Sequence, residues 1–222
     1  MPTILYGCPH ACSLVTHIAL EHTSEEFAFA HVDLFSNAQR APDFLALNPR
    51  GRVPVLATSD MVLTETPAIL VWLSQRHPQA GILPAVFAAG ASHIIADLSW
   101  FASGVHTALS RVMAPGRFVA GDACTSNLRE AACRALVDEF RLIDRRLGAR
   151  HWWLDKWSGL DAYLFWLWAR SGEGPIDLRS YSNWARHTLR MLERPQVRRA
   201  LDRERKISPC YPDLDRSPMQ AS

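Results

Sequence analysis

The sequence lacks long apolar runs, a dominant charge of one sign and a regular set of cysteines. Its longest apolar run, residues 162–169, is far too short to cross a bilayer, and no basic start followed by an apolar core resembles a secretory signal. The 24 basic and 22 acidic residues nearly cancel, which gives no reason to expect nucleic acid or a membrane as a partner. We therefore expect a cytoplasmic protein whose 222 residues bury a sizeable core.

The 5 cysteines are odd in number and do not have the spacing of a secreted disulfide framework. Histidines do not gather with them at zinc-finger spacing, so we expect no metal site. Cys8 and Cys12 are separated by one residue more than in a redox Cys-x-x-Cys pair, and a local disulfide between them is a less favoured alternative. Cys124, Cys133 and Cys210 are interpreted as packing or tail residues.

Cys12 stands out because it directly precedes a helical pattern. Residues 3–6 are apolar and β-prone, and apolar residues then recur at helical spacing over residues 14–19. The thiol should therefore lie in the first turn of a helix, where unpaired N–H groups and the helix dipole stabilise a thiolate. Cysteine pKa values at such places fall from about 8.5 to roughly 3.5–7.5. The pattern predicts a nucleophilic or redox thiol, with a small buried apolar residue as the alternative.

Residues 1–77 alternate strand-like and helix-like segments. Further strands are expected at residues 27–32, 53–56 and 61–63, the last two as a hairpin, and a short helix at residues 40–47. The next helix should begin with Thr66 as N-cap and Pro67 in the first helical position. This order predicts a small α/β sandwich.

Residues 78–89 are rich in proline and glycine and are expected to form a linker. From residue 90 to residue 206 the pattern is helical, with one-sided apolar stripes over residues 94–109 and 128–147 and a last short helix at residues 195–201. Residues 163–168 are apolar on every side, which predicts a helix buried in the centre of a bundle. Residues 207–222 are expected to be a polar tail.

Two charged features of the second region are interpreted as structural. Asp161 follows Ser158 at the spacing of a capping box, so we expect it to cap a helix rather than to act as a catalytic acid. Basic residues cluster between Arg194 and Lys206, but Asp202 and Glu204 interrupt them, which favours a solvated face.

Several segments, taken together and in this order, form one recognisable set. They are residues 11–14, 17–21, 48–54 and 63–69 in the first region, and His106, residues 158–165 and residues 193–195 in the second. With this set the chain resembles the cytosolic glutathione transferases and, within them, the bacterial beta class, from Met1 to about Leu201. The resemblance implies a thioredoxin-like domain followed by an all-helical domain, in agreement with the two patterns above.

The resemblance also implies a glutathione site. Val53 and Pro54, joined by a cis bond in the family, would pair with the cysteinyl part of glutathione. Glu65 would hold the γ-glutamyl ammonium and Thr66 the carboxylate. From the residues alone, Thr66 is better explained as an N-cap and Glu65 as a side chain that complements the helix dipole.

The resemblance assigns the reacting groups as well. Cys12 would lie beside the glutathione sulfur, and His106 would orient or deprotonate a thiol. His106 falls one position after Val105 of the apolar stripe, so a structural histidine is the alternative. His10 and His17 are further candidates for a histidine near Cys12.

The sequence departs from the family at the site. Residues 35–38 lack the lysine that often holds the glycyl carboxylate, and Arg52 is the candidate replacement. Ser99 and Thr107 stand where beta-class members tend to have asparagine and lysine.

From the resemblance as a whole we expect a homodimeric glutathione transferase with glutathione as co-substrate and a small electrophile bound near the helix of Trp100 and Phe101. The alternatives are a glutathione-dependent thiol–disulfide reductase and a non-catalytic binding protein of the same fold.

Overall fold

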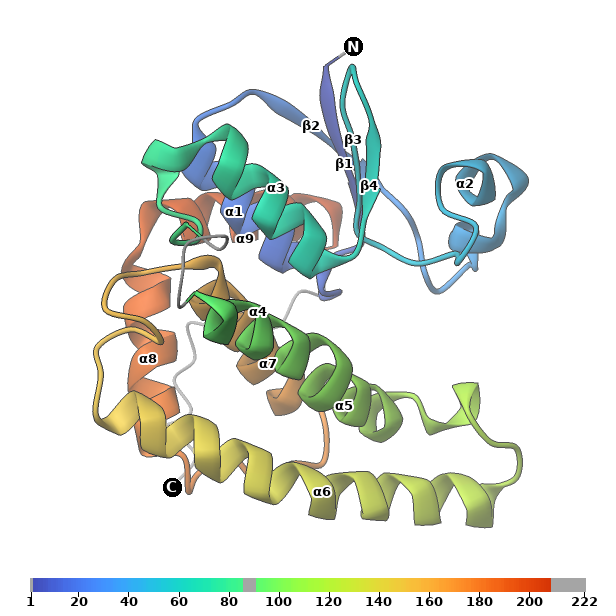
Figure 1. Ribbon diagram of the computed structural model, residues 1–222. Coiled ribbons are helices and arrows are strands. Elements are labelled where there is room, and N and C mark those ends of the chain that lie inside the picture. The colour runs from blue at the N-terminus through green and yellow to red at the C-terminus, as the bar shows by residue number, and fades with distance from the viewer. Residues whose placement is uncertain (1, 86–90, 209–222) are drawn as a thin grey trace. The chain divides into compact units, whose positions relative to one another are not determined.

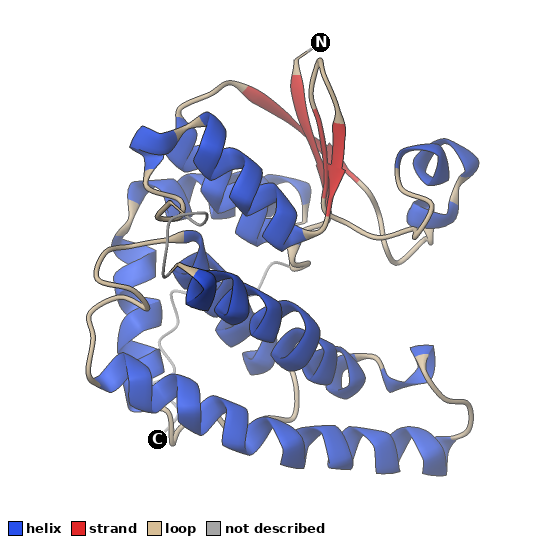
Figure 2. Ribbon diagram, viewed as in Figure 1, coloured by secondary structure: helices blue, strands red, loops and turns tan. Residues whose placement is uncertain are grey.

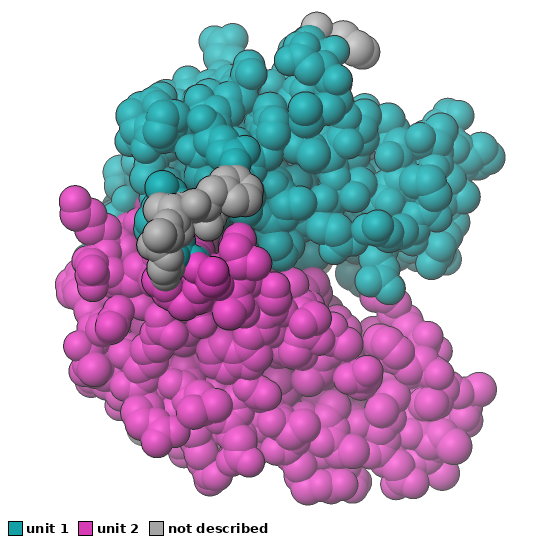
Figure 3. All heavy atoms as spheres, viewed as in Figure 1, with its two compact units in different colours: residues 1–91, 192–212 teal, residues 92–191, 213–222 magenta. Residues whose placement is uncertain are grey.

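The structure is a computed structural model that describes residues 2–85 and 91–208. The chain forms two compact units, which are coloured separately in Figure 3. The first joins the residues up to Ala91 to those from Leu192 onward, and the second is Ser92–Met191. The expected linker and polar tail extend into residues outside the described part, and the domain boundaries expected from the sequence remain a prediction.

A four-stranded sheet is the centre of the first unit. The strands lie in the order β2-β1-β3-β4, with β1 parallel to β2 and antiparallel to β3, and β3 antiparallel to β4. Leu5 of β1 pairs with Leu56 of β3, and both side chains are fully buried. The predicted hairpin is confirmed, although its first strand begins two residues later than expected. The strands are β1 (Thr3–Gly7), β2 (Phe27–His31), β3 (Val55–Ala57) and β4 (Val62–Thr64).

Helices cover both sides of this sheet, as Figure 1 shows. Helices α1 (Ser13–Thr23) and α3 (Thr66–Arg76) lie on one side, and α2 (Pro42–Leu47) lies on the other. Helix α9 (Pro195–Ile207), from the far end of the chain, packs along α1. This arrangement is thioredoxin-like, as predicted.

The described residues of the second unit form helices joined by loops and contain no strand (Figure 2). Every residue of α7 from Gly159 to Ala169 is buried, which confirms the predicted central helix. In the part of the chain that the structure describes, no helix is long and apolar enough to span a membrane. The helices of this unit are α4 (Ser92–Ser99), α5 (His106–Met113), α6 (Asp122–Gly148), α7 (Gly159–Gly172) and α8 (Ser182–Glu193), and a short 3-10 turn lies at Pro115–Arg117. Two further 3-10 turns, Ala38–Arg40 and Pro78–Ala80, belong to the first unit.

The apolar stripe over residues 94–109 is not one regular helix. Between α4 and α5 the backbone makes a π-helical turn, Trp100–Val105, in which the His106 amide donates to the Phe101 carbonyl. A π-turn changes the register of the side chains by one residue, and such turns occur often at functional sites. The sequence spacing alone, which fits a regular helix, did not indicate it.

The C-terminal helix corrects two expectations. Helix α9 continues to Ile207 rather than ending at Leu201, because its buried face repeats at Val197, Leu201 and Glu204. The interpretation of the basic cluster as a solvated face is wrong for Glu204, which is fully buried.

Candidate functional site

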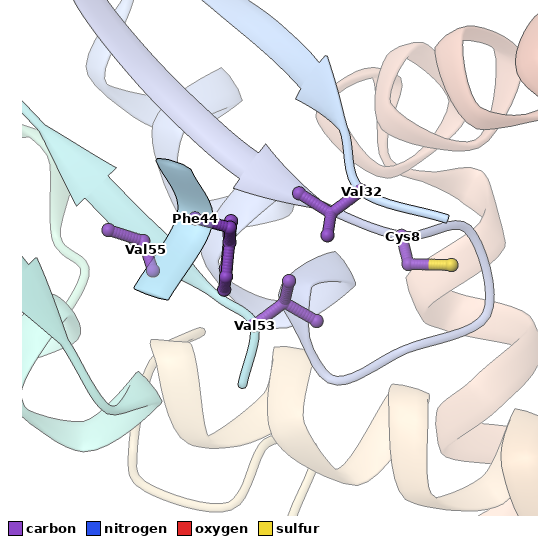
Figure 4. Close-up of a cluster of buried hydrophobic side chains, with 5 residues drawn as sticks. All are labelled: Cys8, Val32, Phe44, Val53 and Val55. Atoms are coloured by element: carbon purple, nitrogen blue, oxygen red, sulfur yellow. The ribbon is translucent and has the colours of Figure 1, made fainter. Parts of the chain in front are cut away.

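A small hydrophobic cluster fixes the two backbone segments on which the candidate site depends. Figure 4 shows its members, Cys8, Val32, Phe44, Val53 and Val55, whose side chains come from different segments of the first unit. Cys8 and Val53 are both nearly inaccessible to solvent. Because protein interiors pack closely, burying both residues in one cluster restricts two backbone segments. One leads from Cys8 to the start of α1, and the other leads from Val53 into β3.

Cys12 lies immediately before α1, as predicted. Its thiol donates a hydrogen bond to the Val53 carbonyl oxygen at 3.4 Å. The preceding turn is closed by a hydrogen bond from the Ala11 amide to the Cys8 carbonyl, 3.0 Å long. No disulfide joins Cys8 to Cys12, so the local disulfide is not formed.

The predicted thiolate at Cys12 is wrong for this structure. Burial of the sulfur raises the pKa of Cys12 to about 12, and the nearby Glu65 carboxylate adds to this increase. A hydrogen bond from the Thr66 side chain, the helix backbone and the charge of Arg52 all oppose the increase, but burial dominates the pKa. The thiol therefore stays protonated at neutral pH and acts as a hydrogen-bond donor.

The loop before Val53 is held by a residue that the sequence analysis did not single out. The Asn48 amide group donates to the Arg52 carbonyl at 2.7 Å, and its oxygen accepts from the Arg50 amide at 3.1 Å. The Val53–Pro54 peptide bond is cis, as the resemblance implied. Asparagine before proline is a common turn signal, and Asn48 precedes Pro49, so this signal was available in the sequence.

Glu65 and Thr66 form the start of α3, one residue earlier than predicted. Glu65 is the N-cap and Thr66 the first helical residue, because Glu65 adopts a left-handed φ of 71° that interrupts the chain before the helix. A non-glycine residue with positive φ is strained, and such residues cluster at functional sites. The half-exposed Glu65 carboxylate accepts a hydrogen bond from Arg50 at 2.7 Å, a partner that the sequence analysis missed.

The structure brings most of the predicted site residues together in the first unit. Cys12 contacts Val53 directly and interacts with Arg52, Glu65 and Thr66. Thr66 is buried and Arg52 is exposed. The cluster thus combines a thiol, a helix start and an arginine, which suit a ligand with a sulfur atom and carboxylates.

His106, the other predicted catalytic residue, belongs to the second unit. It is the first residue of α5, directly after the π-turn. Its Nδ1 atom lies 3.1 Å from the Tyr163 hydroxyl oxygen, and its ring meets the Trp166 ring edge-on at 4.5 Å between centroids. The side chain is partly buried, and these contacts fix its orientation within that unit.

The other two histidine candidates have different surroundings. His17 is fully buried, and its Nδ1 atom lies 3.1 Å from a carboxylate oxygen of Glu204 on α9. The backbone amide of His10 donates to the other oxygen of Glu204 at 3.4 Å. His17 is therefore part of the packing between α1 and α9.

The predicted capping box at the start of α7 is confirmed. Asp161 accepts hydrogen bonds from the Ser158 amide and hydroxyl at 2.8 and 3.0 Å. Its other oxygen accepts from the Trp153 amide at 2.8 Å and lies 2.9 Å from Nε2 of His187. The buried carboxylate thus ties together three segments of the second unit, which accounts for it without a catalytic role.

Comparison with known proteins agrees with this fold. The family model of the glutathione S-transferase N-terminal domain matches residues 1–75. Glutathione S-transferase GST-4.5 of Xanthomonas campestris is 29% identical, over 90% of this chain and 98% of its own. A solved structure of a beta-class glutathione S-transferase from Sphingomonas chungbukensis is 31% identical, with a TM-score of 0.81 over 90% of this chain and 98% of that one. A glutathione transferase homologue from Sulfitobacter, solved with bound glutathione, has 25% identity and a TM-score of 0.83 over 91% of this chain and 98% of its own.

The thioredoxin-like unit, the helical unit and these relatives define the class of protein. The chain belongs to the glutathione S-transferase family, with bacterial beta-class structures among its neighbours. It is accordingly a glutathione transferase.

Proposed function

We propose that this transferase conjugates glutathione to small electrophiles, with Cys12 beside the glutathione sulfur. The observation that supports this most directly is the contact of the Cys12 thiol with Val53, next to the buried Thr66 at the start of α3. This set of groups suits a thiol-containing peptide, since Val53 lies just before β3, where its backbone amide would pair with an extended ligand. Glutathione is the co-substrate named by the family.

The γ-glutamyl end of glutathione would bind at the start of α3. A helix N-terminus favours a carboxylate, because its first amide groups point outward and the helix dipole is positive there. Thr66 adds a hydroxyl group at this place, and the Glu65 carboxylate would take the ammonium group. Arg50 contacts one oxygen of Glu65 and would hold this carboxylate in position for the ammonium.

Arg52 would bind the glycyl carboxylate. It is exposed, directly precedes Val53 in the chain, and its charge already acts on the Cys12 sulfur. Guanidinium groups bind carboxylates through two parallel hydrogen bonds, so a single arginine is enough to replace the missing lysine. Asn48, which holds the Arg52 carbonyl, would keep this segment fixed.

The protonated Cys12 thiol would stabilise a glutathione thiolate by donating a hydrogen bond to it. His106 would accept the proton from the glutathione thiol, after which the thiolate attacks the electrophile and the leaving group departs or the addition is completed by a proton. A thiol with a pKa of about 12 is itself a poor nucleophile at neutral pH, which favours a supporting role for Cys12 in conjugation.

Calorimetric titration of the freshly reduced protein with reduced glutathione tests the proposal first. We expect binding between micromolar and low millimolar concentrations for the wild type, and weaker binding after Arg52→Ala. Asp60→Ala, on the exposed β3–β4 turn, serves as the matched control and should bind like the wild type. Binding that is unchanged by Arg52→Ala would contradict the assigned carboxylate site, and no binding at several millimolar would favour the non-catalytic alternative.

A glutathione-dependent thiol–disulfide reductase is the second candidate, favoured by the free thiol at the start of α1. The small fraction of Cys12 present as thiolate would attack a mixed disulfide, forming a Cys12–glutathione disulfide and releasing the substrate thiol. A second glutathione thiolate would then attack this disulfide, releasing glutathione disulfide and restoring the Cys12 thiol. Reduction of a glutathione mixed disulfide without turnover of an aryl halide would favour this activity. Loss of both activities in Cys12→Ser would fit either candidate. The deciding measurement is therefore the ratio of the wild-type rate of mixed-disulfide reduction to its rate of aryl halide conjugation.

The electrophile site near Trp100 and the homodimeric state remain predictions from the family resemblance. Trp100 donates its indole N–H to Glu139 at 2.7 Å, so its ring is held in place within the second unit. A dimer would be tested by sedimentation or light scattering across a concentration series.

A further inference from the structure

A polar seam joins α1 to α9, and we define it as the buried residues His17, Glu21 and Glu204 with the half-exposed Arg199 and Arg203. Its two helices come from opposite ends of the chain and pack side by side in the first unit. His17 and Glu204 are both fully buried, and Glu21 is nearly so. Burying a charged group is costly unless it is paired, so the partners of these side chains indicate what the seam does.

The two carboxylates of the seam have different closest partners, although Nε2 of His17 also lies 4.0 Å from an oxygen of Glu21. Glu21 is bound by the arginines of α9, with Arg199 at 2.7 Å and Arg203 at 3.3 Å. Glu204 instead contacts His17, whose ring packs against Phe27 and Phe29 at centroid distances of 5.6 and 5.0 Å. The ring is fixed by these aromatic contacts, and Glu204 is therefore held in one place.

The second oxygen of Glu204 reaches the loop that bears Cys12. The His10 amide donates to Oε2 of Glu204 at 3.4 Å, while Oε1 faces His17. His10 has a left-handed φ of 67°, which a non-glycine residue adopts only when its surroundings hold it there. His10 lies two residues before Cys12 in the chain, so a shift of the His10 backbone would move the thiol.

The other side of the same loop has its own restraint. The Ser13 hydroxyl accepts from the Cys8 amide at 3.1 Å and donates to the Cys8 carbonyl at 3.0 Å. Ser13 is fully buried at the start of α1. Cys12 thus lies between a local restraint made by Ser13 and a long-range restraint made by Glu204.

We propose that Glu204 is a positioning residue for the Cys12 thiol, acting from the C-terminal helix through the His10 amide. This proposal rests on the proposed role of Cys12 at the glutathione sulfur. In this arrangement α9 contributes Glu204 to the support of the Cys12 loop, in addition to packing against α1. The geometry makes Glu204 a determinant of both thiol accessibility and glutathione affinity.

The test measures how fast iodoacetamide alkylates Cys12, read by mass spectrometry with Cys12→Ala as the background, together with KM for glutathione and kcat. Glu204→Met keeps a similar volume but removes both acceptors, and it should raise the alkylation rate and KM at least about fivefold, with a smaller change in kcat. Asp202→Asn removes an exposed carboxylate of the same helix and should leave all three values unchanged. Glu204→Asp, which keeps the charge but is shorter, should change the rate and KM in the same direction to a smaller extent.

His10→Gly separates positioning from general destabilisation. Glycine adopts a left-handed φ at little cost, so the loop should keep its conformation without Glu204. We therefore expect Glu204→Met to change the alkylation rate at least about threefold less in the His10→Gly background than in the wild type.

Two results would overturn the proposal. One is a lower melting temperature in Glu204→Met and Glu204→Asp with wild-type alkylation and KM, and the other is an effect of Glu204→Met that His10→Gly does not reduce. If Glu204→Met does not fold, Glu204→Asp and its combination with His10→Gly decide by the same criteria. Alkylation needs no glutathione, so a wild type that binds no glutathione would reject the proposed function while the alkylation rates still test the restraint.

Discussion

The start of α7 and the starts of α1 and α3 are organised in opposite ways. At α7, Ser158 and Asp161 form a closed capping box, and the Asp161 carboxylate is fully buried among donors. At α1 and α3, the described residues that precede each helix, Cys12 and Glu65, make no side-chain cap. Helix starts leave amide groups that need partners, so a closed cap stabilises the fold whereas an open one suits a ligand.

The contrast also separates two carboxylates that the sequence presents in similar settings, each near a helix start. Asp161 is inaccessible to solvent, and its carboxylate contacts four polar groups of three residues. Glu65 is half-exposed, has a strained backbone conformation and pairs with the exposed side chain of Arg50. A buried, fully bonded carboxylate stabilises a structure, and an exposed ion pair contributes little to stability.

The largest effect is expected when the closed helix start is broken. Asp161→Ala removes the acceptor for Ser158, Trp153 and His187 and leaves their buried polar groups unpaired. We expect the free energy of unfolding to fall by about 3–5 kcal/mol, measured by urea denaturation. Asp155→Ala, whose side chain is fully exposed, is the control and should stay within about 0.5 kcal/mol of the wild type.

The second effect concerns the thiol at the open start of α1. Burial raises the pKa of Cys12 to about 12 from 9.0, so the folded protein holds the proton until strongly alkaline pH. Since only the thiolate reacts, alkylation at pH 8 should be roughly 10³-fold slower than for an ordinary thiol and should rise about tenfold per pH unit up to pH 10. A rate that levels off near pH 9, after subtraction of Cys12→Ala, would contradict the raised pKa.

A smaller effect is expected at the start of α3. Thr66→Val keeps the shape but removes the hydroxyl that hydrogen-bonds to Cys12 and would bind the γ-glutamyl carboxylate. We expect the glutathione dissociation constant to rise about tenfold, which corresponds to about 1.4 kcal/mol. Thr66→Ser, which retains the hydroxyl, should bind nearly as well as the wild type, and equal losses in both variants would argue against the hydroxyl.

The smallest effect is expected at the exposed pair beside it. Arg50→Ala breaks the contact with Glu65 and should lower the free energy of unfolding by less than about 1 kcal/mol, because both side chains are more than half exposed. Glutathione affinity should nevertheless decrease if Arg50 holds Glu65 for the ammonium. Calorimetry measures the change in glutathione affinity and urea denaturation the change in stability of the same variant. A stability loss comparable with that of Asp161→Ala would contradict the difference proposed between the starts of α3 and α7.

Local signals predicted a large part of the fold. The capping box at Ser158 and Asp161, the all-round apolar helix at residues 163–168 and the hairpin after residue 53 were all confirmed. Each depends on residues close together in the chain, whose spacing is enough to indicate which backbone hydrogen bonds form. The resemblance then gave the thioredoxin-like arrangement and the family, which the comparisons confirmed.

The candidate site was predicted only in part. The positions of Cys12, Val53 and Thr66 followed from their motifs, and the structure brings these residues together. The protonation of Cys12, the pair of Arg50 with Glu65 and the π-turn before His106 were not predicted. A pKa depends on how many atoms exclude water from the group, and sequence spacing contains no measure of that.

The sequence by itself determined the order of the elements, the division into an α/β region and a helical region, and the identity of the thiol at the start of α1. Only the tertiary structure decided that Glu204 is buried rather than solvated and that it contacts both His17 and the His10 amide. The physical reason is distance along the chain, since helical spacing fixes which residues share a face but not which distant segment covers that face.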